Sequence, residues 1–461
     1  MITGKTLIAW GHEPAPWFKE AIDSANSALA TGGEEAARAA VSAIARANEP
    51  PRQVPLRANG ELPYHRNIEA NDAHDAANIE KVDATMRELM RTPTIRAGAV
   101  MPDACPAGPM GTIPVGGVVA CKDAIHPGFH SADICCSMAL SVLGDVDPSV
   151  VLDAGMKLSH FGPGARAYSH DMRPSNHLLG QFEENTFLSM TTDAAQKHFG
   201  TQGDGNHFFF VGRMQSTGHV AIVTHHGSRK PGALLYKAGM EAAERYRCKL
   251  SPETLPQNAW IPIETSEGET YWNALQVIRT WTKHNHFAIH DAVAKYLGAK
   301  IKDRFWNEHN FVFERDGMFF HGKGATPAWE YYAADSSGLT LIPLNMAEPI
   351  LVVRGRDAKN GLGFSPHGAG RNWGRKEHIR RLGTHSAEDV VKREAPDIDV
   401  RFWCGAPDVS ELPSAYKSAE TVRDQIAHFD LAEIVDQIVP TGTIMAGDWA
   451  RDAPWRRKKR R

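Results

Sequence analysis

The sequence has few cysteines and no long apolar segment. Only six cysteines occur among 461 residues, which is too few for a disulfide-stapled scaffold, so we expect reduced thiols. No run of about 18 apolar residues is present, which argues against a transmembrane helix. The first residues also lack the basic and apolar regions of a secretory leader. We therefore expect a cytoplasmic protein with no membrane partner.

A large excess of charge of one sign is also missing. The chain has 51 basic and 54 acidic residues, for a net charge of −3. The last six residues, 456–461, are all basic, so the preceding 455 residues hold 45 basic and 54 acidic side chains and a net charge of −9. Because the rest of the chain is mildly acidic, we exclude a protein surface that is positively charged throughout and binds nucleic acid non-specifically. We expect residues 448–461 to form a disordered basic tail that adds affinity for polyanions.

Composition and patterning indicate a globular chain with mixed secondary structure. Apolar residues make up 42% and charged residues 23%, as in ordinary globular proteins. Helical spacing of apolar residues predicts helices within 1–50, and the proline-rich stretch that follows suits a connector. Further on, strand-like and helical segments alternate without a repeat, with helices expected near 234–248, 270–299 and 413–440.

These patterns predict an α+β fold. We expect one large catalytic body of mixed sheets with surrounding helices over residues 95–447. An N-terminal helical segment and connector, residues 1–94, would precede this body and pack on it. Glycine, proline and short apolar runs are frequent between 95 and 145, a texture typical of ligand sites held on loops.

Five short motifs place chemically capable side chains in loops beside apolar runs. Each motif alone is more often an ordinary turn than a site. Together they supply a carboxylate, a thiolate and several imidazoles, the ligand set of a transition-metal site, which favours Mn, Fe, Co or Zn over Mg. The motifs are Asp133-Ile-Cys-Cys136, Gly205-Asn206-His207, Thr224-His225-His226-Gly-Ser228-Arg229, His309-Asn310 and Pro366-His367-Gly-Ala-Gly-Arg371.

Two of these motifs also suit a phosphate group. Ser228 and Arg229 follow an apolar strand and offer a hydroxyl and a guanidinium beside a glycine N–H. Gly368, Ala369 and Gly370 let the backbone approach a ligand closely. The chain has no GxxxxGK[ST] motif, which excludes a P-loop nucleotide site.

The ordered series of motifs resembles the RtcB family of RNA-splicing ligases. Several motifs in the family's order are a far more specific signal than any one of them. The resemblance covers roughly residues 95–447. The matching segments are MPDAC from 101, DICC from 133, GNHF from 205, HHGSR from 225, HN from 309, HGKGAT from 321, PHGAGR from 366 and AYKS from 415.

The resemblance implies an RNA ligase. Such an enzyme joins 2′,3′-cyclic phosphate or 3′-phosphate ends of tRNA halves or other cleaved RNA to 5′-hydroxyl ends, using two Mn²⁺ ions and GTP. His367 would accept a nucleoside monophosphate, and Asp103 would fix its tautomer. The need for an activating partner protein stays open.

The resemblance also assigns roles to the other motif residues. Cys136 would bridge the two ions, which would neutralise charge on phosphate oxygens. The implied metal ligands are Asp133, Cys136, His207, His225 and His309. The implied nucleotide- or phosphate-binding residues are Asn206, Asn310, Asn345, Gly368, Ala369, Gly370, Arg371 and Tyr416.

The chain departs from the family pattern where the nucleobase is expected. Phe210 stands where the family has a glutamate, Ile350 where it has a serine and Ala446 where it has a lysine. The PGSMG loop of the family is replaced by Pro343-Leu-Asn345-Met-Ala347. Losing a charged hydrogen-bond partner of a buried base costs about 1.5–3 kcal/mol. We therefore expect a divergent member with weakened guanine preference, for which another nucleotide stays open.

Two other functions stay open at this stage. A binuclear metal-dependent phosphoesterase acting on nucleic-acid or nucleotide phosphates would keep the metal ligands and abandon the nucleotide pocket. A non-catalytic RNA-binding paralogue is disfavoured, because Asp133, Cys136 and the three ligand histidines all remain.

Overall fold

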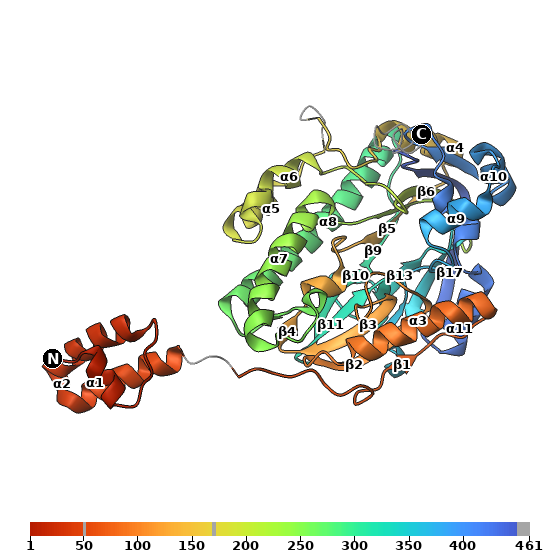
Figure 1. Cartoon of the computed structure of the whole chain (residues 1–461). Helices are drawn as coiled ribbons and strands as arrows, with labels where there is room; N and C mark the ends of the chain where they lie inside the picture. The colour runs from red at the N-terminus through yellow and green to blue at the C-terminus, as the bar shows by residue number, and fades with distance from the viewer. Residues whose placement is uncertain (49–51, 168–171, 450–461) are drawn as a thin grey trace, which may run out of the picture. The chain divides into compact units, whose positions relative to one another are not determined.

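The computed structural model describes residues 1–48, 52–167 and 172–449 (Figure 1). Residues 450–461 of the expected basic tail lie outside the described residues. The chain divides into two compact units. One consists of Met1–Val54 with Lys249–Pro252, and the other of Pro55–Cys248 with Glu253–Arg461. The six cysteines are all free, as expected.

The first unit is helical. α1 (Gly4–Ala9) and α2 (Phe18–Ala47) form it, and the helix axis of α2 breaks at Gly33, whose φ of 74° suits glycine. The helices predicted within residues 1–50 are therefore confirmed. They bury small side chains against one another, as the alanine-rich sequence indicates. The core of this unit consists of Ile2, Leu7, Ala21, Ala25, Ala37 and Val41.

A five-stranded sheet forms one half of the second unit. Its order is β1-β2-β3-β11-β10, in which only the β1–β2 pair is parallel. Valine and alanine runs fill the buried positions of β2 and β3. The strands are β1 (His65–Arg66), β2 (Ile95–Cys105), β3 (Val115–Lys122), β10 (Asn310–Arg315) and β11 (Met318–Lys323).

An eight-stranded sheet forms the other half. Its main path is β13-β14-β17-β6-β7-β5-β9, and β16 pairs with β17. The N–H of Leu341 on β13 donates to Asn307 Oδ1 on β9 at 2.9 Å, so the two edge strands meet and the sheet curls. The strands are β5 (Ser137–Gly144), β6 (Phe208–Met214), β7 (Val220–His226), β9 (Asp303–Glu308), β13 (Leu339–Ile342), β14 (Ile350–Gly355), β16 (Asp399–Phe402) and β17 (Ala432–Met445).

Two short strand pairs and a set of helices complete this unit. The pairs are β4 (Ala124–Ile125) with β8 (Ile261–Pro262) and β12 (Ala325–Pro327) with β15 (Phe364–Pro366). The helices are α3 (Ala73–Leu89), α4 (Pro148–Leu158), α5 (Asn176–Glu184), α6 (Thr192–Lys197), α7 (Arg229–Leu250), α8 (Ser266–Leu297), α9 (Arg375–Leu382), α10 (Ala387–Glu394) and α11 (Ala419–His428).

Helices α7 and α8 lie side by side along one flank of the sheets (Figure 1). They approach closely because Gly239 of α7 leaves room for the ring of Tyr271, which a Cβ at that position would meet at 2.5 Å. Thr265 caps the start of α8 by accepting from the N–H of Gly268, and Gly298 ends the helix with φ of 64°. The predicted helices at 234–248 and 270–299, and the α+β class, are confirmed.

The expected helix at 413–440 is only partly right. Within that range α11 ends at His428, and β17 begins at Ala432. Ile434, Val435, Ile438 and Val439 have a spacing that also suits a helix, which explains the error. Strand pairing on both sides, with β14 and β6, decides the conformation, because tertiary context outweighs local propensity. Among the described residues, no helix combines the length and apolarity needed to cross a membrane.

A buried ion pair ties α8 to β9. Arg279 of α8 contacts the carboxylate of Glu308, whose side chain is fully buried, and also bonds Asp335 Oδ1 through Nη2 at 2.8 Å. Burial raises the pKa of Glu308, and the Arg279 charge opposes that rise. Removing one partner of a buried pair leaves an uncompensated charge.

We predict that Arg279→Met lowers the free energy of unfolding by about 3–5 kcal/mol, because Glu308 is left buried and unpaired. Chemical denaturation at neutral pH measures this. The matched control is Arg304→Met, which breaks a more exposed pair with Asp291 and should cost about 0–1 kcal/mol. Equal losses in the two variants would contradict the assignment.

Candidate active site

The register of the eight-stranded sheet brings four motif residues together where neighbouring strands begin or end. β7 runs antiparallel to both β5 and β6, so its last residues face the first residues of each. Ser137 of β5 is paired with His226 of β7 and with Glu308 of β9, and Phe208 of β6 is paired with His225 of β7. The residues at or beside these strand ends are Cys136, His207, His225 and His309.

Two groups of side chains there have the arrangement of metal ligands. One is Cys136, His225 and His309, and the other is Asp133, Cys136 and His207. Within each group the ligand atoms lie within 4.8 Å of one another. Cys136 Sγ lies 3.2 Å from His225 Nε2 and 3.6 Å from His207 Nε2. Cys136 belongs to both groups, so its sulfur would be a ligand of an ion held by either group.

The protonation state of two of the histidines fits a metal site. Burial lowers the pKa of His225 to about 3 and that of His309 well below its usual range, so both imidazoles are neutral. His225 Nδ1–H donates to the carbonyl oxygen of Asn206 at 3.1 Å, which leaves the lone pair on Nε2. His225 Nε2 faces His309 Nε2 at 3.2 Å. Neutral imidazoles around a cysteine sulfur and a carboxylate suit a transition-metal ion.

Helix α8 supports these strands from behind through buried histidines. His286 Nε2 lies 3.0 Å from Ser137 Oγ, and its Nδ1 lies 2.6 Å from Thr224 Oγ1. His290 bonds Thr224 Oγ1 at 2.8 Å and Ser141 Oγ at 2.8 Å. These histidines are therefore hydrogen-bonded core residues that hold the strands next to Cys136 and His225.

His367 forms a short hydrogen bond with Asp103. Its Nδ1–H donates to Asp103 Oδ2 at 2.6 Å, and its backbone N–H donates to the same oxygen at 3.2 Å. Asp103 is fully buried, whereas His367 keeps 17% of its side chain exposed. The pair fixes the tautomer that leaves the lone pair of His367 on Nε2. The His367 ring centroid lies 4.9 Å from that of His309, which places this histidine beside the metal-ligand groups.

Gly370 is required for the approach of the His367 loop to Asp103. Its φ is +72°, and a Cβ there would lie 2.0 Å from the carbonyl oxygen of Asp103. A larger residue would therefore push the loop away from the carboxylate that orients His367. The close contact with Asp103 thus explains why the second glycine of the Gly-Ala-Gly segment is needed.

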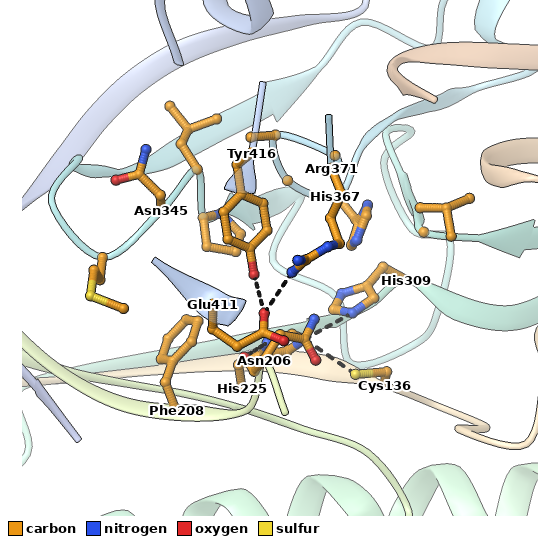
Figure 2. A pocket seen from close by; sticks show the side chains of 18 of the residues that line it. Cys136, Asn206, Phe208, His225, His309, Asn345, His367, Arg371, Glu411 and Tyr416 are labelled. Carbon is orange, nitrogen blue, oxygen red and sulfur yellow. Dashed lines mark hydrogen bonds and ion pairs between the residues drawn. The ribbon is translucent and has the colours of Figure 1, made fainter. Parts of the chain in front are cut away.

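A cavity of about 330 Å³ joins these groups (Figure 2). His367 and the metal-ligand residues Asp133, Cys136, His225 and His309 line it. Asp103 and His207 stand behind this wall, each hydrogen-bonded to a lining residue. The expected nucleotide- or phosphate-binding residues all line the cavity: Asn206, Asn310, Asn345, Gly368, Ala369, Gly370, Arg371 and Tyr416.

One side of the cavity is largely apolar. Figure 2 shows Phe208 and Asn345 on the side opposite Cys136 and His309. Phe210 is buried and stands on the same strand as Phe208, and Ile350 is buried as well. The apolar lining consists of Phe208, Phe210, Leu344, Met346, Ile350 and Met445.

A buried carboxylate that sequence reasoning missed lies in the wall of the cavity. Glu411 accepts from Arg371 Nη1 at 3.0 Å, from Arg375 Nε at 2.6 Å and from the hydroxyl of Tyr416 at 2.5 Å (Figure 2). Burial, and then the charge of Glu411, raise the pKa of Tyr416, so its hydroxyl stays a donor. The only signal was the position of Glu411 just before the AYKS segment.

Ser228 and Arg229, which the sequence pattern suggested could bind a phosphate, do not line the cavity. Ser228 Oγ donates to the carbonyl oxygen of Ile134 at 2.6 Å. Arg229 donates to the carbonyl oxygen of Gly162 at 2.8 Å and to Thr201 Oγ1 at 3.2 Å. Neither residue lines the cavity, and both brace the loops around it.

Comparison with known proteins agrees with this geometry. Residues 149–446, well over half of the chain, match the family model described as tRNA-splicing ligase RtcB. The chain belongs to the RtcB family. The expected resemblance is therefore confirmed. Asp103, Asp133 and Cys136 precede the matched range, but the structure brings all three to the RtcB-matched residues around the cavity.

Curated RtcB relatives are distant, with about a quarter of the aligned residues identical. The tRNA-splicing ligase RtcB of Archaeoglobus fulgidus is 26% identical over 294 residues, which cover 54% of this chain and 60% of that protein. The tRNA-splicing ligase RtcB of Thermococcus kodakarensis is 26% identical over 286 residues, 53% of this chain and 58% of that protein. The RNA-splicing ligase RtcB of Escherichia coli K12 is 25% identical over 256 residues, with 52% of this chain and 59% of that protein covered. The chain thus spans about 60% of the length of these relatives.

We predict that each ligand group binds a divalent metal ion, tested with Mn²⁺, and that Cys136→Ala weakens binding at both by at least about a hundredfold, because its sulfur belongs to both groups. Isothermal titration calorimetry of metal-free protein with Mn²⁺ measures the number of metal sites and their affinities. The control is Cys135→Ala, since the neighbouring thiol packs in the hydrophobic core instead. Loss of a single site in Cys136→Ala would argue against a bridging sulfur.

Proposed function

We propose that this chain is a metal-dependent RNA ligase that works in the cytoplasm through a nucleotidylated histidine. It would join 2′,3′-cyclic phosphate or 3′-phosphate ends of tRNA halves or other cleaved RNA to 5′-hydroxyl ends. The observation that carries the proposal is the bond of His367 to buried Asp103 beside two metal-ligand groups that share Cys136. Membership of the RtcB family supports it.

In the first step His367 acts as the nucleophile. Asp103 holds the proton on Nδ1, so the Nε2 lone pair attacks the α-phosphorus of GTP. A nitrogen–phosphorus bond forms, the bond from the α-phosphorus to the bridging oxygen breaks, and pyrophosphate leaves with the bond electrons. Asp133, Cys136, His207, His225 and His309 would hold two Mn²⁺ ions, which supply positive charge that neutralises the phosphate oxygens.

In the second stage the nucleotide activates the RNA end. An oxygen of the RNA 3′-phosphate attacks the nucleotide phosphorus, and the bond to His367 breaks. The 5′-hydroxyl of the other RNA then attacks the 3′-phosphate, loses its proton and displaces the nucleoside monophosphate. Arg371, with Asn206 and Asn310, lines the cavity where these phosphates would lie, and guanidinium groups suit them.

The same two ligand groups could serve a binuclear phosphoesterase. Such a hydrolase needs no covalent nucleotide, and it would use His367, oriented by Asp103, as a general acid or base. Membership of the RtcB family favours the ligase. Hydrolysis of a cyclic phosphate without any nucleoside triphosphate would point to the hydrolase.

We predict that wild-type protein incubated with Mn²⁺ and GTP gains the mass of one nucleoside monophosphate and that His367→Ala does not. Replacing the imidazole removes the only group proposed to bond the phosphorus. Intact-protein mass spectrometry measures the adduct. His385→Ala, at an exposed histidine, should keep it. An undiminished adduct on His367→Ala would remove this histidine from the mechanism.

We predict weak discrimination between nucleobases, with adduct formation from GTP and ATP differing by less than about tenfold. The two carboxylates that line the cavity are both engaged: Asp133 bonds His207, and Glu411 takes three donors. Phe210 and Ile350 are apolar. Rates of mass gain with GTP, ATP, CTP and UTP measure the preference. A rate with GTP more than about a hundredfold above the others would show an unrecognised guanine-reading group.

A further inference from the structure

We propose that α9 extends the active-site cavity as a surface that binds the backbone phosphates of the RNA strand whose 3′ end reacts. The inference rests on the proposed function, because it identifies where that strand leaves the cavity. The sequence of α9 is RKEHIRRL. Its basic residues are Arg375, Lys376, Arg380 and Arg381, against the single acidic residue Glu377.

One face of α9 packs against the protein, and the basic side chains are exposed to solvent. His378 is buried, and its Nε2 lies 2.8 Å from Ser414 Oγ. Leu382 packs against a small core cluster. The four basic residues are all exposed. Glu377 pairs with Arg380 at 2.7 Å, yet 75% of the Arg380 side chain stays exposed. The solvent side of the helix therefore carries an excess of positive charge.

This surface is continuous with the cavity through Arg375. Arg375 is the first residue of α9 and also lines the cavity. Its Nε donates to Glu411, which also accepts from Arg371. One carboxylate thus holds two guanidinium groups at the cavity wall. A phosphate held in the cavity would lie next to the start of α9.

The segment between the cavity and α9 is rigidly held. Trp373 stacks on His74 with ring centroids 3.6 Å apart and an interplanar angle of 15°. The guanidinium of Arg381 lies 3.5 Å from the centroid of the Trp373 ring. Both neighbours thus restrain the indole, and Arg381 is held over it. The start of the helix and Arg381 are therefore held in place before any ligand binds, which lowers the entropy cost of contacts made there.

RNA is the partner whose chemistry fits this surface. Residues 1–455 carry a net charge of −9, so the basic cluster on α9 is local rather than part of a general basic coat. An eight-residue helix is about 12 Å long, which at about 3.4 Å per phosphate covers about three or four phosphates of a strand. Since the Trp373 ring is already stacked, the contacts would be to phosphates and independent of base sequence.

The test compares Lys376→Gln/Arg380→Gln with its parent, both carrying His367→Ala. Because His367→Ala lacks the proposed nucleophile, the outcome does not depend on whether the chain ligates RNA. The probe is a short, fluorescein-labelled single-stranded RNA with a 3′-phosphate. Fluorescence anisotropy measures its dissociation constant between about 50 and 200 mM salt. The matched control is Lys295→Gln/Lys300→Gln, which removes two exposed lysines. Both precede the start of β9, whereas His309 directly follows its end.

We expect weaker RNA binding and a shallower salt dependence. Each lost phosphate contact on a single strand lowers the slope of log affinity against log salt by about 0.7, so the double variant should lose about 1.4. The control pair should keep the parental slope. The proposal is overturned if the α9 variant keeps that slope, or if the control pair changes it equally. It is also overturned if an oligo-glutamate peptide binds as tightly as RNA and depends equally on Lys376 and Arg380.

Discussion

The antiparallel register of β5, β6, β7 and β9 is the constraint on which the site depends. Ser137 lies opposite both His226 and Glu308, and Phe208 lies opposite His225. A shift of one residue in any of these pairs would turn a ligand to the other face of the sheet. The buried histidines of α8 and the Arg279–Glu308 pair fix that register from behind. The metal-ligand groups are therefore a product of strand pairing rather than of any one motif.

The His367 pair depends on a separate sheet and loop. Asp103 lies on β2 of the five-stranded sheet, whereas His367 follows β15. Their bond at 2.6 Å, and the close contact of Gly370 with Asp103, hold the His367 loop against β2. The proposed nucleophile and the proposed metal ligands thus come from different sheets that meet at the cavity. Such a junction can be rigid on both sides, which is what preorganised phosphate chemistry requires.

Sequence reasoning identified residues that the structure brings together where each belongs to a recognisable local pattern. Residues such as Cys136 and His225 stand beside apolar runs that become strands, so each was visible as a loop motif. Glu411 was missed because its partners Arg371 and Arg375 lie 40 and 36 residues away. The segment at 432–445 was read as helical because its local spacing allows a helix, and only its partners β14 and β6 make it a strand. What sequence could not supply was the long-range pairing.

The two ends of the cavity are under different physical demands. At the chemical end, charge develops during the reaction, so each donor and ligand contributes to the rate only if its position is exact to a fraction of an ångström. At the apolar end, contacts with a base would be the same before and during the reaction, and such uniform binding changes affinity rather than the chemical step. Under the proposed function, the apolar Phe210 and Ile350 would relax the choice of nucleotide, whereas changes at Asp103, Cys136 or His367 would affect the chemical step.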